Sequence, residues 1–479
     1  MTDQRNLLLQ TAELAGHFLD SLATRPVRAH ASRAELLEAL GGPIPEHGTA
    51  PGEVIDDLVH AADPGIVASA GPRYFGFVIG GGLSSAVAAD WLATVWDQNG
   101  LFFAMSPAAA VTEEITAGWL LELFGLPATA SVGFTTGVTM ASFAGLAAGR
   151  HRILERAGWI VEDEGLRGAP DIAVVTGAEA HASIYASLQM LGLGKNRVLR
   201  VDADGQGRMR PDALRETLAR VRDQPVLVAA QAGNVNTGSF DPLPEIVAAV
   251  RELPNAWLHV DGAFGLWAAV SPSLRPLVAG LGDADSWSTD SHKWLNVPYD
   301  SGIAMVRDAD AHRAAISHGA AYYIPGTGAE RDGGTWVTES SRRARGFAVY
   351  AALRELGRDG LIDLVERCCR LAARMAAALR DAPGVTILND VVLNQALVRF
   401  TYAGASDAEA DAFTREVIAE VQADGTCWLG GTTWHGMAAM RISISNWRTT
   451  DEDIDVSAAA IRHCRDAVAA RRQGSVAGS

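Results

Sequence analysis

Between about residue 90 and residue 310, short runs of β-branched and apolar residues alternate with longer segments of helical pattern. The runs predict strands at 172–175, 198–201, 226–230, 257–260 and 303–306, and helices are predicted between them, for example at 211–222 and 244–253. Strand and helix in alternation form a mainly parallel sheet with helices on both faces. Ligands of such sheets bind at the carboxyl ends of the strands, so functional residues are expected at that edge.

The segments on either side of this region have a different pattern. The chain has 479 residues, more than one hydrophobic core usually serves, so several packed units are expected. Residues 5–40 carry apolar side chains at helical spacing, and beyond the core 343–356 and 361–379 predict helices and 396–400 and 440–444 predict strands. We therefore expect a helical N-terminal arm over 1–88, a large domain over 89–359, a small α+β domain over 360–470 and a disordered tail over 471–479.

Charge and composition exclude several kinds of partner. The formal net charge of −16 would repel nucleic acid and anionic membrane surfaces. No apolar run is long enough to span a bilayer, and the N-terminus lacks the pattern of a signal peptide. The spacing of the four cysteines fits neither a zinc site nor a disulfide framework, so we expect a cytoplasmic protein without a metal centre.

Two short motifs point to the chemistry. Asp261 follows the predicted strand at 257–260, and Lys293 lies further on in an apolar segment beside Trp294. A lysine can form a Schiff base with the aldehyde of pyridoxal phosphate, and a carboxylate can keep the cofactor's pyridine nitrogen positive, so that the ring accepts electrons. Alone, Asp261 could cap a turn and Lys293 could be a surface lysine. Together they predict a pyridoxal phosphate site.

Thr139 and His181 add two weaker signals. Phe134–Thr139 precedes a predicted helix at 140–157, and the first backbone N–H groups of a helix, with a threonine hydroxyl, are suited to hold a phosphate. His181 is predicted to open a helix after a strand, where its imidazole can stack on a pyridine ring. The ordinary alternatives are a capped helix and a histidine without function.

The order of these residues resembles one family. Residues 139, 181, 261 and 293 resemble the order in the pyridoxal-dependent decarboxylases of the aromatic amino acid, glutamate and cysteine sulfinate group. The resemblance covers about residues 70 to 450, and its supporting matches lie at 73–77, 234–242, 341–346 and 441–447. It implies a fold-type I enzyme that forms a homodimer with its active site at the subunit interface.

The resemblance also implies a role for each matching residue. Lys293 would be the Schiff-base lysine, Asp261 the partner of the pyridinium and His181 the residue that stacks on the ring. The remaining cofactor contacts would be Ala263 on the opposite ring face, Val138, Thr139 and His292 at the phosphate, Asn234 near the cofactor hydroxyl, and Asp290, where many relatives have asparagine. An acid beside a phosphate must be turned away, protonated or counterbalanced.

The expected reaction is decarboxylation of an amino acid to its amine. Relatives that do this carry a loop tyrosine that protonates Cα, whereas this chain has none between Ile324 and Arg343, and Gly333 stands at about that position. Tyr322 or Tyr323 could substitute. The alternatives are oxidative deamination to an aldehyde, aldol-type C–C cleavage, amino transfer, or a scaffold protein without catalysis. Phe77, Tyr322, Tyr323 and Trp434 are candidates to line a substrate pocket, with core packing as the alternative for the aromatic residues.

Overall fold

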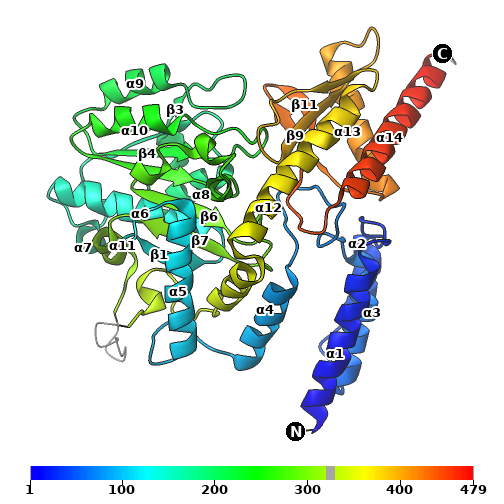
Figure 1. Cartoon of the computed structure of the whole chain (residues 1–479), viewed down its shortest axis with the longest axis horizontal. Helices are drawn as coiled ribbons and strands as arrows, with labels where there is room; N and C mark the ends of the chain where they lie inside the picture. The colour runs from blue at the N-terminus through cyan, green and yellow to red at the C-terminus, as the bar shows by residue number, and fades with distance from the viewer. Residues whose placement is uncertain (1, 320–329, 478–479) are drawn as a thin grey trace. The chain divides into compact units, whose positions relative to one another are not determined.

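A computed structural model describes residues 2–319 and 330–477 of the chain (Figure 1). The chain divides into two compact units. One, which we call the large unit, comprises residues 80–373 and 388–397, apart from the undescribed stretch 320–329. The other, which we call the terminal unit, comprises the remaining described residues.

The large unit is built on a seven-stranded mixed sheet, which confirms the predicted α/β class. The strand order is β1-β7-β6-β5-β4-β2-β3. Only β7 runs against the others, pairing antiparallel with both β1 and β6. The strands are β1 (Ser131–Thr135), β2 (Ala173–Gly177), β3 (Leu199–Val201), β4 (Val226–Gln231), β5 (Ala256–Asp261), β6 (Ser286–Asp290) and β7 (Gly302–Val306). All five predicted strands are present, while β1 and β6 were not anticipated.

Helices cover both faces of this sheet. Strands β4 to β7 are buried at every residue, which requires cover on each side. Helices α6, α8 and α11 form one apolar layer with the sheet, in which Leu146, Leu188 and Trp257 are buried (Figure 1). The α-helices described in the large unit before residue 346 are α4 (Ser84–Trp96), α5 (Pro107–Phe124), α6 (Val138–Arg156), α7 (Val161–Glu164), α8 (Ala182–Met190), α9 (Pro211–Arg220), α10 (Leu243–Arg251) and α11 (Ala309–Ile316).

Helix α12 (Gly346–Arg380) is interrupted at Gly357, whose φ of 60° and ψ of −172° are not helical. The two parts correspond to the helices predicted at 343–356 and 361–379. The domain boundary expected at residue 359 lies within α12, and the division between the units falls at residue 373 instead.

The terminal unit joins segments from both ends of the chain. Backbone hydrogen bonds connect Val27 to Gly425 (2.8 Å) and Phe75 to Trp428 (2.7 Å), so the N-terminal segment packs with C-terminal segments and is not a separate arm. Its sheet has the order β10-β11-β9-β8. The elements are α1 (Thr2–Ser21), α2 (Arg33–Leu40), α3 (Pro51–Ala62), β8 (Val385–Ile387), β9 (Gln395–Phe400), of which the last three residues belong here, α13 (Asp407–Asp424), β10 (Gly430–Trp434), β11 (Met437–Ser443) and α14 (Asp451–Ala477).

Two expectations about the chain's ends and surface can be compared with these elements. Helix α14 continues to Ala477, so residues 471–477, which we expected to be a disordered tail, are helical in backbone. Within the described residues, none of the helices combines the length and the apolar character needed to cross a membrane.

Candidate active site

The carboxyl ends of the strands gather the predicted residues at one edge of the sheet. Strand β5 ends at Asp261 and β6 ends at Asp290, three residues before Lys293. Strand β1 leads to the start of α6 at Val138, and β2 leads to His181. Because these strands point the same way, residues from four segments of the sequence meet at this edge.

Lys293 and Asp290 form a close ion pair. The Lys293 Nζ lies 2.7 Å from Asp290 Oδ2, and the other carboxylate oxygen accepts the backbone N–H of Val138 at 2.6 Å. Asp290 is almost completely buried, whereas the lysine side chain keeps 18% of its surface exposed. The acid that sequence analysis placed near a phosphate is therefore counterbalanced by Lys293. The neighbours Trp294 and Leu295 are fully buried, as their apolar character predicted.

Asp261 is buried at the end of β5, and its Oδ1 accepts the backbone N–H of Ala263 at 3.1 Å. Burial raises the pKa of the Asp261 carboxyl, while the nearby positive charges of His181 and Lys293 act in the opposite direction. These three side chains therefore share one electrostatic environment. A buried carboxylate that depends on nearby cations is suited to pair with a protonated pyridine nitrogen.

His181 is the N-cap residue of α8, as predicted. Its Nδ1 accepts the backbone N–H of Ser183 at 3.2 Å and lies 2.8 Å from the Ser183 hydroxyl. The cap fixes the orientation of the imidazole, because Nδ1 is tied to the first turn of the helix. Its stacking on a cofactor ring stays a prediction.

A backbone hydrogen bond fixes the role of one ring nitrogen of His292. The backbone N–H of Ser301 donates to Nδ1 at 3.2 Å, so in the neutral ring the proton is on Nε2. Nε2 lies 3.6 Å from Asp290 Oδ1, and the ring stacks on Tyr299 at 4.3 Å between centroids. Burial lowers the pKa of His292, which favours the neutral ring with its N–H on the side of Asp290.

Glycines let the backbone pack closely at this edge of the sheet. A Cβ on Gly302 would lie 2.5 Å from the backbone of Gly137, so only glycine allows β7 to approach the loop before α6 so closely. A Cβ on Gly137 would point to His292 and Asp290, at 3.4 and 3.5 Å. The helix start, the lysine and the buried acid thus fit pyridoxal phosphate, and the contacts of Val138 and Thr139 with its phosphate stay a prediction.

Asn234 braces the loop that follows β4. Its Oδ1 accepts the backbone N–H groups of Asn236 (2.8 Å) and Thr237 (3.2 Å), and its Nδ2 donates to the carbonyl of Glu179 at 3.4 Å. The side chain therefore joins this loop to the segment before His181. Its predicted contact with the cofactor hydroxyl stays a prediction.

A buried charge cluster that sequence analysis missed fixes the segment around Gly333. Arg342 pairs with Glu113 at 2.6 Å, and Arg331 lies 3.4 Å from the other oxygen of Glu113. A Cβ on Gly333 would lie 2.2 Å from the Arg342 guanidinium and 2.5 Å from the carbonyl of Gly100. Gly333, which stands at about the position where the resemblance expects a loop tyrosine, therefore has no space for a side chain in this structure. Tyr322 and Tyr323 lie outside the described residues.

The other two substrate-pocket candidates belong to the terminal unit. Phe77 is 61% exposed, has a φ of 53° and stacks on Trp428 with 6.0 Å between ring centroids. Trp434 is 2% exposed and stacks on His435 at 4.3 Å. Trp434 is therefore packed in the core, which was the alternative to a place in the substrate pocket. The exposed ring of Phe77 stays a candidate to line that pocket.

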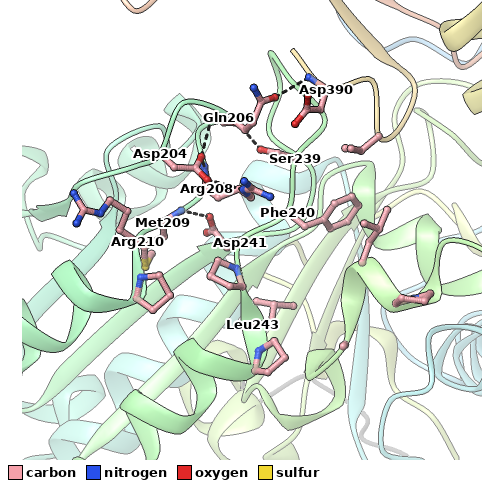
Figure 2. Close-up of a pocket in the computed structure, with 17 residues that line it drawn as sticks. Asp204, Gln206, Arg208, Met209, Arg210, Ser239, Phe240, Asp241, Leu243 and Asp390 are labelled. Atoms are coloured by element: carbon pink, nitrogen blue, oxygen red, sulfur yellow. Dashed lines mark hydrogen bonds and ion pairs between the residues drawn. The ribbon is translucent and has the colours of Figure 1, made fainter.

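A cavity of about 420 Å³ lies at the loops after β3 and β4 (Figure 2). The polar groups on its wall are paired with one another: Arg208 bonds Asp204 at 2.7 Å, and Gln206 accepts the backbone N–H of Asp390 at 2.9 Å. Asp241 is held by backbone N–H groups, one of them from Met209 at 2.7 Å. None of the predicted site residues lines this cavity, and we assign it no chemistry.

A strand-end acid, a nearby lysine and a helix start at one edge of an α/β sheet define a pyridoxal phosphate enzyme of fold type I. The crystal structure of Oryza sativa TDC with PLP and tryptamine has the same fold, with a TM-score of 0.91, 20% identity, and coverage of 97% of this chain and 98% of that chain.

Residues 35–403 match the model of the pyridoxal-dependent decarboxylase conserved domain. The L-2,4-diaminobutyrate decarboxylase of Rhizobium meliloti is 31% identical over 77% of this chain and 72% of its own length. The aromatic-L-amino-acid decarboxylase of Bacillus atrophaeus is 25% identical over 94% and 93%, and the phenylacetaldehyde synthase of Arabidopsis thaliana is 24% identical over 90% and 89%. The chain belongs to the pyridoxal-dependent decarboxylase family, whose enzymes are carboxy-lyases that use pyridoxal phosphate.

Proposed function

We propose that this protein converts an L-amino acid to its amine and carbon dioxide. The observation that carries the proposal is the arrangement of buried Asp261 with the charges of His181 and Lys293 around it. When bound, pyridoxal phosphate supplies an electron sink for the bond that breaks at the substrate Cα.

Each residue has a distinct task in this proposal. Lys293 would hold the cofactor through its amine and release it when an amino acid binds. Asp261 would keep the pyridine nitrogen of the bound cofactor protonated, because its carboxylate is buried and has no bulk water to stabilise it. His181, oriented by its cap, would position the substrate carboxylate.

Protonation of Cα is the step for which this chain lacks the relatives' residue. Gly333 carries no hydroxyl, and the space around it is filled by Arg342 and Gly100. Water, Tyr322 or Tyr323 would then supply the proton to Cα, and slower protonation would leave more time for a reaction with oxygen. The second candidate function is therefore aldehyde formation, an activity named for the Arabidopsis thaliana relative.

Product analysis with a panel of L-amino acids, with and without oxygen, separates the two functions. Decarboxylation predicts amine in a one-to-one ratio to carbon dioxide in both conditions. Aldehyde formation predicts aldehyde and ammonia that disappear without oxygen. Carbon dioxide release from none of the amino acids would contradict both.

We further propose a cytoplasmic homodimer whose active site lies at the subunit interface. Trp91, Leu92 and Val95 form an exposed apolar face on α4, with 42%, 47% and 58% of their surface exposed, which favours a second copy as cover. All four cysteines are free thiols, which fits a reducing compartment.

Sedimentation of the wild type and of Val95→Asp tests the dimer. The substitution places two like charges in a twofold interface, so we expect monomers or a markedly weaker dimer. Met190→Asp, at an exposed site on α8, is the control and should leave the mass unchanged. A monomeric wild type would contradict the proposal.

A further inference from the structure

The carboxylate of Asp290 lies at the first backbone N–H of α6. Val138 is the first residue of this helix, and its N–H donates to Asp290 Oδ1 at 2.6 Å. The first N–H groups of a helix carry a partial positive charge and are the natural donors to a phosphate. Asp290 therefore bonds to a donor that a cofactor phosphate would also use.

The backbone holds Asp290 firmly in this position. Its N–H donates to the carbonyl of Ala263 at 2.9 Å, and its carbonyl accepts the indole N–H of Trp267 at 3.1 Å. The residue is also the last of β6, which pairs with β5 and β7. Only rotation of the side chain could take the carboxylate away from the start of α6.

The charges of Asp290 and Lys293 offset each other. Lys293 Nζ lies 2.7 Å from Asp290 Oδ2, so the two residues together contribute no net charge. His292 lies next to them with a neutral ring, because burial lowers its pKa. Removal of either member of the pair would leave an uncompensated charge in a buried place, where charges interact strongly.

We propose that Asp290 weakens the hold of the site on phosphate groups, by taking the Val138 N–H and by adding a negative charge that Lys293 offsets. Asp290 is then the residue that sets cofactor affinity and makes the cofactor exchangeable. The inference concerns cofactor binding, and it holds whichever product the enzyme forms.

The test measures binding of inorganic phosphate to the full chain freed of cofactor, by calorimetry, in four proteins. The net charge of the 290–293 pair is zero in the wild type, +1 in Asp290→Asn, −1 in Lys293→Ala and zero in the double variant. We expect phosphate to bind about tenfold more tightly to Asp290→Asn, about tenfold more weakly to Lys293→Ala, and with near wild-type affinity to the double variant.

Pyridoxal phosphate and pyridoxal provide a second readout, since only the first carries a phosphate. Because Lys293 reacts with the aldehyde of both, Asp290→Asn should lower the dissociation constant of pyridoxal phosphate by a larger factor than that of pyridoxal, as measured by quenching of tryptophan fluorescence. Asp285→Asn is the matched control, because Asp285 also accepts one backbone N–H (2.8 Å, from Leu258) and pairs with one cation (3.0 Å, Arg251), before the opposite end of β6. It should leave phosphate binding unchanged.

Equal or weaker phosphate binding by Asp290→Asn would overturn the proposal, as would a double variant that matches Lys293→Ala. Loss of affinity for all three ligands together would mean that Asp290 only shapes the site. Asp290→Ser, which also removes the charge, repeats the comparison if the asparagine variant does not fold.

Discussion

At the scale of single residues, the carboxylate of Asp261 has two roles that mutation can separate. Its Oδ1 caps the turn at Ala263, while its charge is what a pyridinium requires. Asp261→Asn keeps an oxygen for the turn and removes the charge, whereas Asp261→Ala removes both. We expect both variants to keep bound cofactor and to lose turnover by about a thousandfold, measured as carbon dioxide release.

The control for this pair is Asp285→Asn, which changes a buried acid outside the site and should keep its turnover. If Asp261→Asn retained near-normal activity, the aspartate would be no more than a turn cap.

His259 gives the protein a predictable response to acid. The ring is buried between Ser286 (2.9 Å) and Ser288 (3.3 Å), and burial lowers its pKa from 6.5 to about 3. The unfolded chain therefore binds a proton that the native ring does not, and the free energy of unfolding falls as the pH drops below 6.5. Acidification from about pH 7.5 to about pH 5.5 should therefore lower the free energy of unfolding by about 1.4 kcal/mol through this residue.

Urea unfolding of His259→Gln at the two pH values checks this effect. The variant should lose less stability than the wild type on acidification, by about that amount, whereas His463→Gln, at an exposed position, should follow the wild type. Burial raises the pKa of Asp241 to about 6, and this shift changes the free energy of unfolding in the opposite direction on acidification. The contribution is common to all three proteins. Parallel pH profiles for His259→Gln and the wild type would exclude the assignment.

Sequence predicted the residues whose chemistry is specific and missed those that act through ordinary contacts. Lys293 and Asp261 could be found because a covalent bond to an aldehyde and a charge at a strand end demand particular residue types. Glu113 and Arg342 could not, because a buried ion pair between distant residues leaves no local pattern. The packing at Gly333 depends on the same pair and was hidden for the same reason.

At the scale of elements, the break in α12 should depend on Gly357. Its φ of 60° is one that L side chains rarely adopt, although no atom lies within 4 Å of its would-be Cβ. Gly357→Ala should therefore lower the free energy of unfolding by about 1 kcal/mol through the backbone alone. Gly360→Ala, three residues on in regular helix, should be neutral or stabilising by up to about 1 kcal/mol.

Thermal and urea unfolding of the two variants give the comparison. Equal effects of the same sign would show that the φ at Gly357 is not what distinguishes these positions.

In the large unit, two strands that the sequence did not predict lack the usual strand pattern for a physical reason. Strand β6 is Ser286–Asp290, with four polar residues, and its hydroxyls find partners in the elements packed against it, as the 2.9 Å contact of Ser288 with Ser142 on α6 shows. Strand β1 contains Gly133, whose missing side chain makes room for the carbonyl of Trp336. Neither strand has the β-branched alternation on which the predictions relied.

At the scale of the whole molecule, the alternating core was predictable and the division into units was not. Alternation of strand and helix is local, so it can be read from the order of residues. The terminal unit forms because Phe75 bonds Trp428 and Ser443, contacts between opposite ends of the chain that no composition shift marks. No composition shift marks the division within α12 either, and the domain boundary predicted at residue 359 lies inside this helix.

The most direct test of the account is reduction of the cofactor-loaded protein with borohydride, followed by peptide mapping. The chain contains two lysines, Lys195 and Lys293, and Lys195 is exposed and is not one of the predicted site residues, so it serves as an internal control. The account predicts one pyridoxyl group per chain, on Lys293, and its loss in Lys293→Ala. A pyridoxyl group on Lys195, or none on either lysine after cofactor is supplied, would contradict it.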